Sequence, residues 1–228
     1  MTIEQNVADI AASSLDAVRV FERYGIDYCC GGKRPLAEVC REKGLAPETL
    51  LSELTKERGT DRLDADWNSS SLSELIHHIV ARHHEYLKSE LPQLDQRLAK
   101  VVKVYGATPR LAGLPEVFAA LRAELEMHLH KEEVILFPFI ERLESGESVM
   151  APCGWIEHPI SMMEHEHDSA GHALRRIRAI TADFEVPEGA CVTYRSLLAG
   201  LEQMERDLHL HIHLENNILF PRALDRGR

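Results

Sequence analysis

The sequence has no surplus of positive charge and no long apolar run. It contains 26 Lys and Arg against 37 Asp and Glu, a formal net charge of −11. Nucleic-acid-binding proteins usually carry a basic patch or stripe, so we expect no nucleic-acid partner. The longest apolar stretch, VILFPFI, is far too short to cross a bilayer. The start MTIEQNVADI also lacks the basic residues and apolar run of a secretory signal, so we expect a cytoplasmic protein.

Cysteine is scarce as well, with five irregularly spaced residues. An odd number in a chain of this length is not a secreted disulfide framework. Cys40 and Cys191 are expected to be small buried residues. Cys29 and Cys30 are neighbours, and a disulfide between neighbours closes a strained ring. Two interpretations stay open. The pair is either an exposed dithiol that holds or passes a soft metal, takes up a nitrosyl group or changes redox state, or a turn with one thiol in a small core.

Histidine is absent from the first 76 residues, whereas all 13 histidines lie between His77 and His213. The two regions must therefore differ in chemistry. Residues 1–60 read as short helices around the turn DYCCGGK, and residues 58–70, rich in Gly, Asp, Asn and Ser, indicate a linker. Residues 71–228 contain amphipathic segments of helical period, with no sustained two-residue alternation. These segments span about 71–103, 115–143, 159–183 and 190–223. We predict an all-α protein with a small N-terminal helical domain followed by a four-helix bundle.

A sequence repeat runs through the bundle region. Residues 128–138, HLHKEEVILFP, and residues 211–221, HIHLENNILFP, are identical at seven of eleven positions. The same shift of 83 positions carries His84 onto His167. This pattern indicates a duplicated helical hairpin with one histidine on its first helix and an H-x-x-x-E motif on its second.

The repeat also selects among neighbouring polar residues. Glu133 falls on Asn216 and His83 falls on Glu166, so neither is repeated. His128 and Glu132, and equally His211 and Glu215, are four residues apart and share a helix face. The repeated set is therefore His84, His128, Glu132, His167, His211 and Glu215. His130 and His213 repeat too but point across the helix, so we expect them, with His83, to be outer partners that orient the ligands.

Four imidazoles and two carboxylates at one level of a bundle suit two metal ions, each with two histidines and both bridged by the glutamates. A single histidine on an apolar face is more often a satisfied core residue, and a lone H-x-x-x-E is often only a solvated pair. The duplication of all six residues favours a metal site over these interpretations.

The motifs DYCCGGK, HKEEVILFP, EHDSAG and HLENNILFP together resemble the iron–sulfur cluster repair di-iron proteins, which are hemerythrin-like bundles with an appended N-terminal domain. The resemblance covers essentially the whole chain. It implies a non-haem di-iron centre on the same six residues, with two carboxylate bridges and an oxo bridge. It also implies a role in protecting or restoring iron–sulfur proteins after nitric oxide or peroxide damage. The loop residues Cys153 and His158 match none of these motifs.

Three functions remain to be separated. The first is a repair factor that supplies iron to damaged iron–sulfur proteins, with Cys29 and Cys30 as the relay. The second is a hemerythrin-like carrier or sensor of O₂ or NO, and the third is an enzyme that reduces NO at the di-iron centre. A bundle with only structural zinc is a fourth interpretation. Neither the metal loaded in the cell nor a possible homodimer follows from the sequence.

Overall fold

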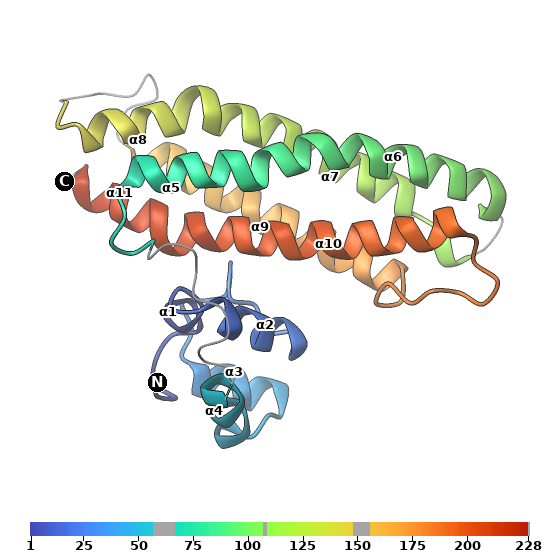
Figure 1. Ribbon diagram of the computed structural model, residues 1–228, viewed down its shortest axis with the longest axis horizontal. Helices are drawn as coiled ribbons and strands as arrows, with labels where there is room; N and C mark the ends of the chain where they lie inside the picture. The colour runs from blue at the N-terminus through green and yellow to red at the C-terminus, as the bar shows by residue number, and fades with distance from the viewer. Residues whose placement is uncertain (57–66, 107–108, 148–155, 228) are drawn as a thin grey trace.

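The computed structural model describes residues 1–56, 67–106, 109–147 and 156–227, and within these ranges the regular structure is helical. This confirms the predicted all-α fold. The described helices from α5 onward form a bundle of four long antiparallel rods, and a group of short helices packs beside it (Figure 1). None of the described helices has the length and apolarity needed to cross a membrane. Most of the predicted linker and residues 148–155 of the predicted loop, Cys153 among them, lie outside the described residues. His158 was expected in this loop, but it lies in the first turn of a helix, so that expectation was wrong.

The rods of the bundle follow the predicted segments closely. The first rod comprises α5 (Leu72–Ile79), η1 (Val80–His84) and α6 (Glu85–Tyr105), and the short η2 (Pro109–Leu111) follows it. The second rod comprises α7 (Leu114–Lys131), η3 (Glu132–Leu136) and α8 (Phe137–Glu144), and the third is α9 (Glu157–Ile180). The fourth rod comprises α10 (Val192–Leu214), η4 (Glu215–Leu219) and α11 (Phe220–Arg226). The first rod begins at a capping box, in which Ser71 and Glu74 each bond the backbone of the other.

Three of the rods contain a turn of π-helix, in η1, η3 and η4. A π turn is wider than an α turn by one residue and is often found at functional sites. The π turns η3 and η4 occupy equivalent places in the two repeats. The segment equivalent to η1 lies in α9 and is ordinary α-helix.

Two apolar clusters fill the bundle at different heights. One contains α6 and α10 residues such as Leu94 and Leu201, and the other contains α5, α8 and α11 residues such as Leu75, Phe137 and Phe220. On every rod the predicted ligands fall where one cluster gives way to the other. The polar residues thus form a layer across the bundle, closed from above and below by apolar side chains.

The N-terminal domain has its own hydrophobic core, which includes Phe21, Tyr28, Leu36 and Cys40. Its helices are α1 (Val7–Ala11), α2 (Leu15–Arg23), α3 (Leu36–Lys43) and α4 (Pro47–Lys56). Cys40 is buried as predicted, whereas Cys191 is exposed at the start of α10, so that prediction was wrong.

The loop between α2 and α3 docks on the last rod of the bundle. Asn217 donates hydrogen bonds to the backbone carbonyls of Tyr28 at 3.2 Å and Cys29 at 3.0 Å. The ring of Tyr28 lies edge-on to that of His213, with centroids 5.5 Å apart. At Gly32 a Cβ would lie 2.4 Å from the Tyr28 carbonyl oxygen, so this turn requires a residue without a side chain.

Candidate metal centre

The four predicted histidine ligands come from the four rods of the bundle and are all buried. His84 ends the π turn η1, His128 lies in the last turn of α7, His167 lies in mid-α9, and His211 lies near the end of α10. Their Nε2 atoms converge. The Nε2 atoms of His84 and His211 are 3.2 Å apart, and those of His128 and His167 are 3.1 Å apart.

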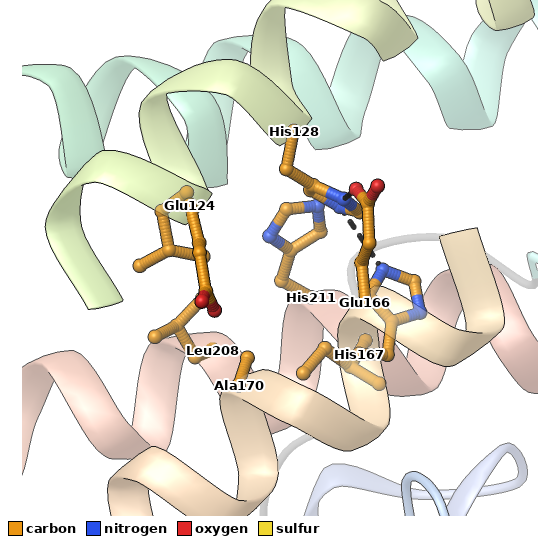
Figure 2. Close-up of a pocket in the computed structure, with 9 residues that line it drawn as sticks. Glu124, His128, Glu166, His167, Ala170, Leu208 and His211 are labelled. Atoms are coloured by element: carbon orange, nitrogen blue, oxygen red, sulfur yellow. Dashed lines mark hydrogen bonds and ion pairs between the residues drawn. The ribbon is translucent and has the colours of Figure 1, made fainter. Parts of the chain in front are cut away.

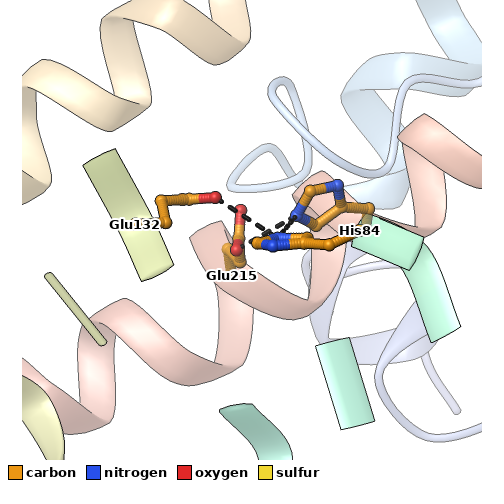
Figure 3. Close-up of side chains that lie close together, drawn as sticks. His84, Glu132 and Glu215 are labelled. Atoms are coloured by element: carbon orange, nitrogen blue, oxygen red, sulfur yellow. Dashed lines mark hydrogen bonds and ion pairs between the residues drawn. The ribbon is translucent and has the colours of Figure 1, made fainter. Parts of the chain in front are cut away.

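Two carboxylates complete the layer, each at the first position of a π turn. Glu132 opens η3 and Glu215 opens η4, and both are fully buried. Glu132 Oε2 lies 3.4 Å from His84 Nε2 and 3.3 Å from His128 Nε2. Glu215 lies 3.1 Å from the Nε2 atoms of both His167 and His211. Figure 3 shows His84, Glu132 and Glu215 directed toward one another.

Burial dominates the electrostatics of the layer. Burial and the adjacent Glu215 carboxylate raise the pKa of Glu132 well above its usual value. Burial lowers the pKa of His84 and of His211 to about 4. The imidazoles of His84 and His211 are therefore neutral at physiological pH, which is the form that binds a metal.

A ring of acceptors outside this layer holds the imidazoles in orientation. His84 Nδ1 donates to Glu133 at 2.8 Å, His128 Nδ1 donates to Glu166 at 2.9 Å, and His167 Nδ1 donates to Asn216 at 2.8 Å. Lys131 also pairs with Glu166. Because each Nδ1 carries the proton, each Nε2 presents its lone pair to the centre of the bundle.

These outer partners differ from the ones expected from the sequence. His130 is exposed, and His213 is buried against the Tyr28 carbonyl of the N-terminal domain, so the expectation was wrong for both. His83 does lie beside a predicted ligand, because its ring stacks on that of His211 with centroids 5.6 Å apart. The acceptors that the sequence reasoning missed are Glu133, Glu166 and Asn216. They sit at the positions where the repeat is broken, which was the available signal.

The donor set fits two cations. Both oxygens of Glu132 and of Glu215 are buried without a hydrogen-bond partner among the described residues, a costly arrangement unless a cation is bound. The six residues form two groups of four that share both carboxylates. These are His84, Glu132, His211 and Glu215, and His128, Glu132, His167 and Glu215. Two ligands about 2.1 Å from one metal are roughly 3 Å apart, which matches the spacing of the paired Nε2 atoms.

A narrow pocket opens beside this layer. His128, His167 and His211 line it together with Glu124 and Glu166, and Figure 2 shows the three imidazoles gathered together with Glu124 apart from them. A small molecule in this pocket would therefore contact imidazoles of both groups.

Comparison with known proteins agrees with this geometry. Residues 75–223 match the hemerythrin HHE cation-binding domain, and residues 3–58 match the ScdA_N domain, a domain of unknown function. The iron-sulfur cluster repair protein YtfE of Escherichia coli (strain K12 / DH10B) is 39% identical over 222 residues, 97% of each chain. The protein of the same name from Shigella boydii serotype 4 gives the same values. The chain belongs to this hemerythrin-like iron–sulfur cluster repair family. The resemblance predicted from the four motifs is thereby confirmed.

The vicinal cysteines of this family member lie in the docked loop, within the ScdA_N domain. Cys29 Sγ is 3.9 Å from Cys30 Sγ and 3.3 Å from Asp27 Oδ1, and these three residues form a further group able to hold a metal. Cys29 is only 6% exposed and Cys30 is partly exposed, so of the two interpretations left open, the exposed dithiol does not hold for Cys29. The hydrogen bond to Cys30 and burial raise the pKa of the Cys29 thiol well above its usual value.

A cleft between the ScdA_N domain and the bundle borders this pair. Cys29 and Cys30 line it together with His209 and Ile212 of α10. Cys30 faces α9, because a Cβ at Gly171 would lie 4.0 Å from its Sγ. The dithiol thus lies against the same rods that carry His167 and His211.

Proposed function

We propose that this protein binds two iron ions in the bundle and supplies iron to iron–sulfur proteins whose clusters have been damaged by oxidative or nitrosative stress. The observation that carries the proposal is the closed layer of four buried imidazoles and two buried carboxylates that have no hydrogen-bond partner among the described residues. The match to a cation-binding domain supports a bound metal, and the relatives named for iron–sulfur cluster repair support iron as that metal and damaged iron–sulfur proteins as the clients.

The residues that would hold the ions are His84, His128, His167 and His211, with Glu132 and Glu215 shared between the two. Imidazole and carboxylate suit iron, whereas thiolates are absent from this layer. Two imidazoles and two shared carboxylates would leave each ion able to accept a further small ligand. When bound, the ions supply redox-active centres able to accept small ligands.

The role of the protein around these ions is to hold them reversibly. The outer acceptors keep the Nε2 lone pairs directed inward, and the apolar clusters above and below exclude water. We propose that Asp27, Cys29 and Cys30 receive iron on its way to a client. The thiol proton of Cys29 must leave when a metal binds, because the thiolate is the ligand form.

Metal content with optical and Mössbauer spectra of the isolated protein tests the centre. We expect two irons per chain, antiferromagnetically coupled, and their loss in the Glu132→Ala, Glu215→Ala variant. Glu126→Ala, an exposed glutamate on α7, is the matched control and should keep both irons. Zinc, or no metal after reconstitution with ferrous iron, would contradict the proposal.

Reactivation of an iron–sulfur enzyme with a damaged cluster tests the relay. The Cys29→Ala, Cys30→Ala variant should retain two irons yet reactivate the client more slowly than the parent. Cys191→Ala, which removes an exposed thiol on the bundle, should behave as the parent. Equal reactivation by the dithiol variant would end the relay part of the proposal.

The pocket beside His128 favours a second function, the binding of O₂ or NO. A reversible spectral change on gas addition, with no iron transferred to an apo-protein, would support a carrier or sensor. Consumption of more than one equivalent of NO per site with reductant would instead support an NO-reducing enzyme.

A further inference from the structure

The duplicated hairpin places two copies of each outer position around the metal layer, and these copies have diverged. The repeat superimposes His84 on His167 and His128 on His211. If the outer partners were also repeated, the two metal positions would be alike. The partners can therefore be compared position by position.

The first pair of outer positions keeps its hydrogen bond. Glu133 accepts from His84, and Asn216, its equivalent, accepts from His167, both at 2.8 Å. An acceptor is present in both repeats, although a carboxylate in one is an amide in the other.

At the second pair of equivalent outer positions, the hydrogen bond to the histidine of the layer is present in one repeat and missing in the other. Glu166 accepts from His128 Nδ1 at 2.9 Å, but its equivalent is His83. His83 stacks on His211 with an angle of 8° between the rings, and its own Nδ1 donates to Asp207 at 3.0 Å. His211 Nδ1 is buried with no hydrogen-bond partner among the described residues.

This difference affects only one of the two groups of residues that could hold a metal, which we call metal positions. His128 and His167, which share a position, both have an outer acceptor, whereas in the other position only His84 has one. An outer acceptor fixes the ring of a ligating histidine and raises its basicity, and its loss typically costs about 10–100-fold in metal affinity.

We infer that the two metal positions are not equivalent, and that the ion held by His84 and His211 is bound more weakly and is released first. The choice of iron as the released ion rests on the proposed function. The weaker position includes α10, the helix whose His209 and Ile212 line the dithiol cleft. The easily released ion is thus held by a helix that borders the cysteines.

Release of iron from the loaded full-length protein to a chelator in excess tests this inference. We expect two phases of one iron per chain each, with the fast phase about tenfold or more faster than the slow one. Mössbauer spectra of protein loaded with ⁵⁷Fe should show two distinct iron environments, of which one disappears in the fast phase.

A variant that copies the other repeat gives the sharpest comparison. His83→Glu supplies the carboxylate that Glu166 provides to His128, and Asp207→Asn in the same chain avoids two facing carboxylates. In this double variant the fast phase should slow by about tenfold. Asp207→Asn alone should keep the fast phase. His172→Glu, the same change at an exposed position of α9, should also leave release unchanged.

A substitution in the opposite direction keeps the inference testable even if the double variant does not bind iron. Glu166→His places a histidine beside His128, as His83 lies beside His211, and should accelerate the slow phase. A single phase containing both irons in the parent would overturn the inference while leaving the proposed function intact. Two phases that neither exchange alters would overturn it as well. Absence of two bound irons would instead contradict the proposed function.

Discussion

The docking of the dithiol loop on the bundle can be weakened at one side chain. Asn217 donates to two backbone carbonyls of the loop. Each such bond contributes about 1 kcal/mol net, so Asn217→Ala should weaken docking by roughly 2 kcal/mol. A change of 1.4 kcal/mol is tenfold in an equilibrium constant, so the undocked fraction should rise by roughly 30-fold.

Alkylation of the individual cysteines measures this fraction. Cys29 is buried, yet it lies outside the hydrophobic core of the N-terminal domain. We therefore expect its thiol to react mainly when the loop is undocked. In Asn217→Ala the alkylation rate of Cys29, quantified by peptide mass spectrometry, should rise by roughly 30-fold, in step with the undocked fraction.

Two other cysteines make the assay specific. Cys40 is fully buried in the core of the N-terminal domain, so its labelling reports unfolding of the domain itself. Cys191 is exposed and calibrates the reagent. Gln93→Ala, which removes an exposed amide bonded within α6, is the control variant. An unchanged Cys29 rate, or a Cys40 rate that rises equally, would refute the reasoning.

Three further predictions concern stability, each measured by urea unfolding. In the metal-free protein His84 and His211 stay neutral down to about pH 4, whereas unfolded histidine gains a proton below about 6.5. The unfolded state therefore binds more protons in this window, and lowering the pH through it should reduce stability by up to about 3 kcal/mol per histidine; a flat profile would contradict this. Gly32→Ala should cost about 1–3 kcal/mol, because its Cβ would lie 2.4 Å from a carbonyl oxygen, and an unfolding curve like the parent's would show that the turn relaxes. Arg178→Met should cost about 2–4 kcal/mol, because it leaves the buried Glu205 carboxylate unpaired, and the Arg178→Met, Glu205→Leu double variant should recover most of this loss.

The layer of six polar residues could be predicted because two independent rules select it. Residues four apart share a helix face, so His128 falls beside Glu132 and His211 beside Glu215. The repeat then brings His84 and His167 into the same set. The structure places all six together, although their role as iron ligands stays a proposal.

The outer partners could not be predicted in the same way. Selection by repetition discards residues such as Glu133 and Glu166, because they differ between the two hairpins. A position outside the metal layer needs only an acceptor within reach of Nδ1, so a carboxylate and an amide both serve. Repetition is therefore informative for ligands and misleading for the residues that support them.

The burial of Cys29 depends on contacts that are distant in sequence. Its neighbours in the sequence predict a turn, and a turn is usually exposed. The bundle covers it through Asn217, which is 188 positions away. No local pattern records such a contact.

The π turns give the bundle a consequence for changes in chain length. Each turn adds one residue, and one residue rotates a helix by about 100°. A π turn takes up this extra residue within itself, so the side chains on either side of it keep their faces. Deleting one residue from Glu132–Leu136 would let the rod continue as plain α-helix with Phe137 and Ile140 still in their apolar cluster, but it would remove the widened turn that begins at Glu132. We therefore expect a one-residue deletion in this turn to leave the packing of the bundle intact and to disturb the polar layer alone.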